Sequence, residues 1–153
     1  MRRKHVPLKG VLIGIIFVIL VFLLVRCVFD TSEQEALEVV DEFYRYEQKG
    51  EFAHSWELFH SSMKQRFSKG HYIQDRAHVF MNHFGVETFT YTIGEPEKLE
   101  EWKISKDQPV LNHVYKFLVT QTYKGKYGNF DIQQEVFVVQ EKEKWKIMWD
   151  YNH

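Results

Sequence analysis

The amino-acid sequence predicts an α+β domain behind an N-terminal transmembrane helix. An unbroken apolar run occupies residues 10–25, and the remainder has an ordinary globular composition. Between residues 33 and 83, apolar residues recur every three or four positions, which is typical of amphipathic helices. From residue 86 onward, apolar and polar residues alternate, which is typical of strands. Helices followed by a long antiparallel sheet are the order expected of an α+β fold.

The apolar run has the character of a membrane-spanning helix. Its sixteen residues, GVLIGIIFVILVFLLV, would extend roughly 24 Å as a helix, somewhat less than a hydrocarbon core of about 30 Å. Lys9 and Arg26 at its ends can reach the lipid headgroups, and residues 27–29 can lengthen the span. The sequence therefore predicts a transmembrane segment at residues 10–29, with the lipid bilayer as its partner.

Charge sets the expected orientation and fate of this segment. The tail 1–9 carries four basic residues, whereas Arg26 is soon followed by acidic residues, so the tail is expected in the cytoplasm and residues 31–153 outside the cell membrane. No pair of small residues suited to signal peptidase closes the run, which favours an uncleaved signal anchor. Arg26 also precedes the single cysteine, Cys27, which disfavours a lipoprotein signal.

Residues 31–153 are long enough to enclose one hydrophobic core. They contain 15 basic and 20 acidic residues, a net charge of −5, which disfavours nucleic-acid binding. A single cysteine permits no intramolecular disulfide. Phosphate-binding glycine loops and serine-nucleophile motifs are absent from the sequence, so nucleotide-dependent and hydrolytic functions lose support.

Three helices are expected at the start of this domain. The first spans residues 33–48, where Ser32 and Glu35 have the spacing of a capping box. A second, short helix begins at Glu51 and should form a hairpin with the first, and a third runs from about 68 to 83. The inward stripe of the first helix consists of Ala36, Val39, Val40 and Phe43, and Glu47 falls on the same rhythm.

Strands are expected in the second half of the domain. The predicted strands cover residues 86–93, 113–123, 130–141 and 144–151, and the polar stretch 97–109, anchored by Trp102 and Ile104, has room for a twisted strand. In the last strand, alternation predicts one face made of Trp145, Ile147, Trp149 and Tyr151, and an opposite face made of Lys146, Met148, Asp150 and Asn152.

The order of these elements and several local strings resemble the nuclear transport factor 2-like (NTF2-like) superfamily. The matching strings are Ala36-x-x-x-x-Asp41-x-Phe43-Tyr44, Lys49-Gly50-Glu51-Phe52-Ala53 with Trp56, Phe67-Ser68-Lys69, and Glu143-Lys144-Trp145-Lys146-Ile147. The resemblance covers essentially all of residues 31–153. It implies a cone of about three helices packed on a curved antiparallel sheet.

Within the superfamily, the pattern is most similar to small extracytoplasmic bacterial members behind a membrane anchor, including domains attached to penicillin-binding proteins in Gram-positive bacteria. This resemblance implies a non-catalytic accessory role in the cell envelope, with an envelope protein or a second copy as partner. The superfamily also includes isomerases and dehydratases, so fold alone does not decide function. The acid and tyrosine of such enzymes have no clear counterparts in this sequence, and no catalytic residue is assigned.

The aromatic residues suggest a pocket inside the predicted cone. The predicted pocket-lining residues are Tyr44, Trp56, His83, Tyr91, His113, Tyr115, Phe117, Trp145 and Trp149. A cone lined in this way can bind an apolar ligand or can simply be filled by its own side chains. Either histidine can act on a bound ligand or serve a structural role.

One group of potential metal ligands lies on the third predicted helix. His71, Asp75 and His78 share a face, because they are four and three residues apart. The same face is expected to be solvated, and the stronger His-Glu-x-x-His signature is absent, so neither a metal nor a cofactor is predicted. The sequence thus favours a membrane-tethered interaction module. The alternative is a small-molecule binder or acid-base enzyme that uses the cone interior.

Overall fold

The computed structural model describes residues 8–78, 86, 88–105, 108–125 and 128–151, and within helix α1 it describes no side chains for residues 8–13 and 23–30. The chain divides into two compact units, residues 1–34 and residues 35–153. The described residues form an α+β structure with an antiparallel sheet, as the sequence predicts. Each unit is described separately below.

Four α-helices are described: α1 (Leu8–Gln48), α2 (Phe52–Glu57), α3 (Ser61–Arg66) and α4 (Lys69–His78). The expected helix start at Ser32 was wrong, because α1 is continuous through that position. No glycine or proline interrupts residues 15–49, so nothing in the local sequence stops the helix there. The expected second helix is divided in two, and residues 79–83 of the expected third helix lie outside the described residues.

The division between α2 and α3 has a tertiary cause. The chain at Phe59 forms a parallel bridge with Ile147 of the last strand. In this bridge the Ile147 amide donates to the carbonyl of Leu58 at 2.9 Å, and the His60 amide donates to the carbonyl of Ile147 at 3.0 Å. His60 then caps α3, because its Nδ1 accepts a hydrogen bond from the Ser62 amide at 3.2 Å.

Residues 8–34 of α1 belong to the first unit. Its described side chains at residues 15–22 are all apolar and are 41% to 67% exposed. We find no helix among the described residues that is both long and apolar enough for a membrane crossing.

The sheet of the second unit contains five antiparallel strands: β1 (Phe89–Ile93), β2 (Glu97–Trp102), β3 (Leu111–Gly125), β4 (Gly128–Glu141) and β5 (Lys144–Trp149). The order is β1-β3-β4-β5, and β2 also pairs with β3. β1 pairs with residues 119–123 of β3 and β2 with residues 111–116, so both short strands occupy one side of the long strand. The four predicted strands are confirmed, and the stretch 97–109, which the sequence left open as a strand, contains β2.

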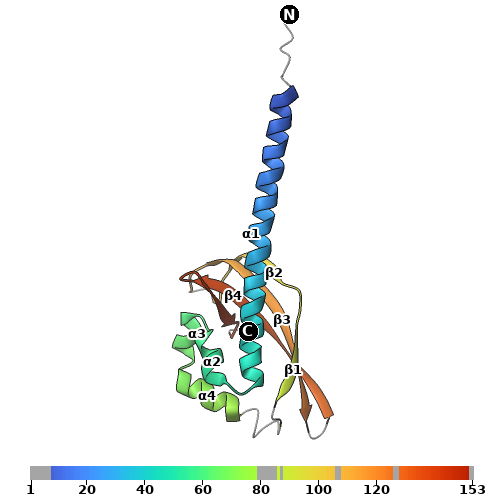
Figure 1. Ribbon diagram of the computed structural model, residues 1–153. Helices are drawn as coiled ribbons and strands as arrows, with labels where there is room; N and C mark the ends of the chain where they lie inside the picture. The colour runs from blue at the N-terminus through green and yellow to red at the C-terminus, as the bar shows by residue number, and fades with distance from the viewer. Residues whose placement is uncertain (1–7, 79–85, 87, 106–107, 126–127, 152–153) are drawn as a thin grey trace, which may run out of the picture. The chain divides into compact units, whose positions relative to one another are not determined.

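The core lies between the sheet and residues 36–47 of α1, which cross its face in Figure 1. Alternate residues of β3 are buried toward this side: Tyr115, Phe117, Val119, Gln121 and Tyr123. The opposite face of β4 and β5 is also covered in part, since Trp102 stacks on Phe137 at 4.1 Å and Met148 is buried. Val136 to Val139 are therefore four consecutive buried residues, where simple alternation predicts only two.

Candidate functional site

A buried carboxylate, that of Glu47, forms the polar centre of the second unit. Glu47 is near the end of α1, on the apolar face of the helix, and its side chain is completely buried. Its Oε1 accepts hydrogen bonds from the hydroxyls of Ser55 and Tyr72, the latter at 2.7 Å. Its Oε2 accepts from Arg76, with Nε at 2.6 Å and Nη2 at 2.5 Å. Three donors from two other helices thus converge on one carboxylate.

The partners of Glu47 are positioned by local helix geometry. Tyr72 and Arg76 are four residues apart on α4, so their side chains lie on the same face. Ser55 lies on α2 and also donates to the carbonyl of Phe52 at 3.1 Å. The Arg76 side chain is 22% exposed, whereas that of Glu47 is completely buried. The network joins α1, α2 and α4.

Burial and charge act on the titratable groups of this centre. Burial raises the pKa of Tyr72 well above its usual value, and the neighbouring Glu47 carboxylate raises it further. Burial alone would lower the pKa of Arg76, but the Glu47 carboxylate more than reverses this, and the net pKa is raised. At neutral pH, Tyr72 is therefore a neutral donor and Arg76 a cation.

A second layer of polar side chains lies between α1 and the sheet. The Tyr44 hydroxyl donates to Gln134 Oε1 at 3.0 Å, and the Tyr123 hydroxyl donates to the buried Gln121 Oε1 at 2.7 Å. Burial raises the pKa of both tyrosines, so both stay protonated at neutral pH. The indole N–H of Trp149 is close enough to Tyr44 to influence its pKa. Yet this buried group makes no hydrogen bond of normal geometry to any described residue.

Aromatic rings pack against one another beside this centre. The Phe59 ring centroid lies 5.2 Å from that of Phe43, 4.8 Å from that of Trp149 and 5.2 Å from that of Tyr72. The contacts with Trp149 and Tyr72 have the edge-to-face geometry that aromatic pairs favour. These rings form part of the hydrophobic core of the second unit.

Some of the predicted pocket-lining residues contact one another, since the ring centroids of Tyr44 and Tyr91 lie 5.7 Å apart. Tyr44, Tyr115 and Phe117 are buried, as expected for inward positions. Trp149 is half-buried within the aromatic packing. His83 lies outside the described residues.

The prediction that His113 points into the cone was wrong. His113 is exposed and has a positive φ of 54°, although its position in the alternation of β3 predicts an inward side chain. The β2–β3 register pairs Leu99 with Val114 and Glu101 with Asn112, and it omits the intervening pair. The left-handed backbone conformation thus breaks the alternation at this position and turns the imidazole to solvent.

The other three predicted residues lie at the margins of the core. Tyr91 donates to the carboxylate of Asp41 at 2.8 Å, and burial together with this hydrogen bond raises its pKa to about 12. Trp145 contacts Tyr115 at 5.5 Å between ring centroids and donates to Glu35 at 2.9 Å. Trp56 lies on α2, where it donates to the carbonyl of Phe67 at 2.8 Å. These contacts hold α1 and α2 to the neighbouring parts of the second unit.

Sequence analysis missed the residues that form the polar centre. One signal was present: Glu47 falls on the apolar rhythm of α1, where a charged residue requires a buried partner. Arg76 gave no such signal, because its partner lies 29 residues away in the sequence. The expected solvated face of α4 is confirmed, since His71, Asp75 and His78 are exposed.

The hydrogen bonds of the polar centre limit the chemistry that its side chains can perform. Both oxygens of Glu47 are occupied by donors, and the adjacent tyrosines are protonated at neutral pH. Within the described ranges, no three His, Cys, Asp or Glu side chains are grouped so as to hold a metal ion. The arrangement stabilises the fold by joining three helices, and the Trp149 N–H is its one buried donor without an acceptor among the described residues.

No protein-family model matches the chain, and no significant match to a curated protein is found.

Proposed function

We propose that this protein is a membrane-tethered, extracytoplasmic and non-catalytic interaction module of the bacterial cell envelope. The hydrogen bonding of Glu47 is the observation that supports a non-catalytic role. An acid-base residue needs an oxygen that is free to meet substrate, whereas both Glu47 oxygens accept hydrogen bonds from protein donors. The aromatic packing around Phe59 supports the same conclusion, because it occupies the interior that a substrate would need.

The membrane anchor is proposed from the sequence and from α1. The run at residues 10–25 is apolar throughout, and the described side chains at 15–22 are exposed. Exposed apolar surface of this extent is typical of contact with lipid or another protein. The basic tail 1–9 supports a cytoplasmic N-terminus.

Membrane fractionation tests the anchor and its orientation. We expect full-length protein with a C-terminal tag to stay in the membrane pellet after alkaline carbonate extraction. Protease added outside intact protoplasts should remove the tag, because the second unit is proposed to be extracytoplasmic. Release of the protein by carbonate, or a tag protected until the cells are lysed, would contradict this proposal.

We also propose an NTF2-like fold for residues 31–153. A helix packed across one face of an antiparallel sheet, with short helices following it in sequence, supports this assignment. The family resemblance implies sheet-mediated pairing, so a homodimer or an envelope partner is part of the proposal. Sedimentation of the full chain in zwitterionic detergent and site-specific crosslinking from the sheet in cells test the two possibilities. A monomer that forms no crosslink from any sheet position would contradict them.

One observation favours the alternative of a small-molecule binder or acid-base enzyme. The buried N–H of Trp149 has no acceptor among the described residues, it lies near the Tyr44 side chain, and the Trp149 ring centroid lies 6.0 Å from the guanidinium carbon of Arg76. A ligand acceptor that met this N–H would be held within the interior. The alternative predicts that a metabolite screen finds a compound that raises the melting temperature of the wild type but not of W149F. The module predicts that no compound behaves in this way.

A further inference from the structure

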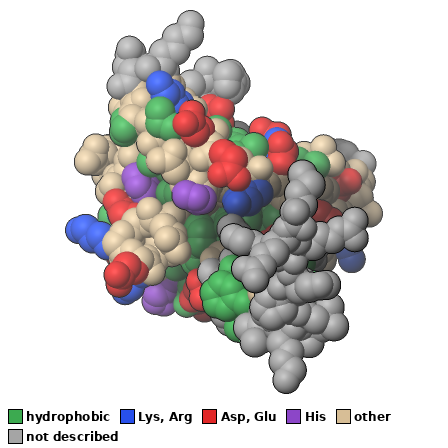
Figure 2. Space-filling view, turned by 90° about the horizontal axis from the view of Figure 1, so that it is seen from above, with side chains coloured by type: hydrophobic (Ala, Val, Ile, Leu, Met, Phe, Trp, Pro, Cys, Tyr) green, Lys and Arg blue, Asp and Glu red, His purple; other side chains and the backbone are tan. Residues whose placement is uncertain are grey.

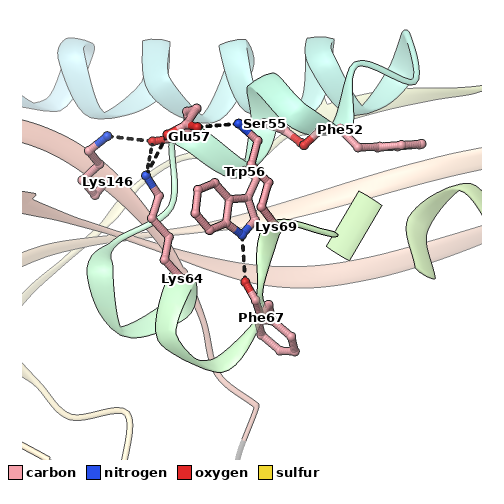
Figure 3. A network of polar contacts seen from close by, with 8 residues as sticks. All are labelled: Phe52, Ser55, Trp56, Glu57, Lys64, Phe67, Lys69 and Lys146. Atoms are coloured by element: carbon pink, nitrogen blue, oxygen red, sulfur yellow. Dashed lines mark hydrogen bonds and ion pairs between the residues drawn. The ribbon is translucent and has the colours of Figure 1, made fainter. Parts of the chain in front are cut away.

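A group of lysines surrounds one carboxylate where α2, α3 and β5 meet (Figure 3). The carboxylate of Glu57 lies 2.6 Å from Lys69 Nζ and 3.2 Å from Lys64 Nζ. The backbone carbonyl of the same residue accepts hydrogen bonds from Lys64 at 3.1 Å and from Lys146 at 2.9 Å. We call Lys64, Lys69 and Lys146 the lysine cluster.

An aromatic ring organises two members of the lysine cluster. The ammonium groups of Lys64 and Lys69 lie 4.7 Å and 5.4 Å from the centroid of the Trp56 ring. The ring is itself held by its hydrogen bond to the Phe67 carbonyl. Cation–π contacts and this anchored ring limit the freedom of both lysine side chains. The cluster is therefore partly preorganised for an anion.

The positive charge of the lysine cluster exceeds the negative charge that it meets. Lys64 and Lys69 share the Glu57 carboxylate, whereas Lys146 forms no ion pair with a described residue, although the carboxylates of Glu141 and Glu57 are near enough to act on its pKa. Three ammonium groups thus lie near two carboxylates. Burial lowers the pKa of Lys146, and the nearby charge of Lys64 lowers it further. An added anion at this position would relieve the repulsion between the two ammonium groups.

We propose that the lysine cluster binds an acidic segment of a protein partner, which gives the proposed interaction module a specific docking site. The bound Glu57 carboxylate demonstrates the geometry with which the cluster holds such a group. The carboxylates of Glu57 and Glu141 lie beside the three lysines, so the cluster is a local basic site and not part of a broad basic surface. On the face shown in Figure 2, acidic and basic side chains are interspersed, and residues 31–153 carry a net charge of −5. Nucleic acid or an anionic membrane would require a wider basic area.

Peptide binding tests this site directly. Full-length protein in zwitterionic detergent micelles would be titrated into fluorescein-labelled hexaglutamate at low salt, with fluorescence anisotropy as the readout. We expect K64Q, K69Q and K146Q each to weaken binding roughly threefold, and the triple variant more than tenfold, as for the loss of partly exposed ion pairs. Binding should also weaken as salt rises.

Two further variants separate the local site from general charge. K124Q removes one positive charge from an exposed position in β3, so its affinity should match that of the wild type. E57Q removes the internal carboxylate that competes for the cluster, while the Glu57 backbone carbonyl still holds Lys64 and Lys146. We therefore expect E57Q to tighten hexaglutamate binding severalfold. A purely structural role for Glu57 predicts weaker binding or no change.

Several outcomes would overturn the docking site. They are an absence of hexaglutamate binding by the wild type, equal losses in K124Q and K146Q, or no gain in E57Q. Binding to phosphatidylglycerol vesicles that depends on the cluster, without peptide binding, would assign the site to lipid instead. The docking site and the proposed function can fail separately. If the triple variant still crosslinks to an envelope partner as the wild type does, the interaction module is supported and only this docking site is rejected.

Discussion

The guanidinium of Arg76 contacts the buried carboxylate of Glu47 through two nitrogens, at 2.5 Å and 2.6 Å from Oε2. This pair joins α4 to the end of α1. The Glu47 side chain is fully buried and that of Arg76 is 22% exposed. Loss of Arg76 and loss of Glu47 should therefore affect stability to different extents. A Glu47 carboxylate left without Arg76 would be a fully buried charge, whereas an Arg76 left without Glu47 belongs to a side chain that is partly exposed.

Substitutions of Arg76 and of Glu47 should therefore lower the free energy of unfolding by different amounts. We expect R76Q to lower the free energy of unfolding by roughly 3 kcal/mol and E47Q by roughly 2 kcal/mol. The double variant should cost less than the two single losses combined, since no charge is left unpaired. Urea denaturation followed by tryptophan fluorescence measures all three.

Glu100 provides the control for this pair, because its side chain is 75% exposed and forms only a surface ion pair with Lys98. E100Q should change the free energy of unfolding by less than about 0.5 kcal/mol. Equal effects of E100Q and E47Q, or additive losses in the double variant, would contradict a coupled buried pair.

The hydroxyl of Tyr72 should contribute to stability separately from its ring. Y72F removes the 2.7 Å hydrogen bond to Glu47 and retains the ring contact with Phe59. We expect a loss of about 1–2 kcal/mol in the free energy of unfolding. Y46F is the matched control, since the Tyr46 hydroxyl donates to Glu42 nearer the surface, and its effect should stay below about 0.5 kcal/mol.

His60 should make stability depend on pH. Burial lowers the pKa of His60 from its usual value of 6.5, and its Nδ1 must be unprotonated to accept the Ser62 amide. Below pH 6.5 the unfolded chain binds the proton before the folded one does, so this contribution to stability is lost as pH falls from 6.5 toward the folded pKa. The urea midpoint of the wild type should decrease over that window.

Asparagine at position 60 can cap α3 without titrating. The change in urea midpoint just below pH 6.5 should therefore shrink in H60N. It should persist in H54N, which replaces an exposed histidine. A pH profile in H60N identical to that of the wild type would assign the dependence to other groups.

The positive φ of His113 predicts the response of this position to substitution. H113V places a β-branched residue at φ 54° and should lower the free energy of unfolding by about 1–2 kcal/mol. Glycine adopts this conformation without strain, so H113G should leave stability unchanged or raise it. N112V, at the neighbouring exposed position in the strand, is the control. If H113V and N112V change the free energy of unfolding equally, the positive φ at His113 does not determine the cost of substitution there.

Most elements of the second unit were predictable because their signals are local. Alternation located β1, β3, β4 and β5. It did not locate β2, which lies in a polar stretch, but the two apolar anchors expected there are confirmed, since Trp102 stacks on Phe137 and Ile104 is buried. The division of α2 from α3 was not predictable, because it depends on backbone hydrogen bonds between residues 58–60 and Ile147. Met148 lies on the face of β5 that alternation gave it, opposite Ile147, but it is buried because this face is partly covered where Trp102 stacks on Phe137.

The sequence by itself determined where most of the helices and strands form, because hydrophobic period and the placement of glycine and proline act over a few residues. Tertiary structure alone decided the buried centre. Glu47 meets Arg76 across 29 residues, and Trp145 meets Glu35 across 110. Such partners have no mutual spacing that a local pattern can reveal. A buried charge requires a counter-charge, but only the packing of the helices determines which residue supplies it.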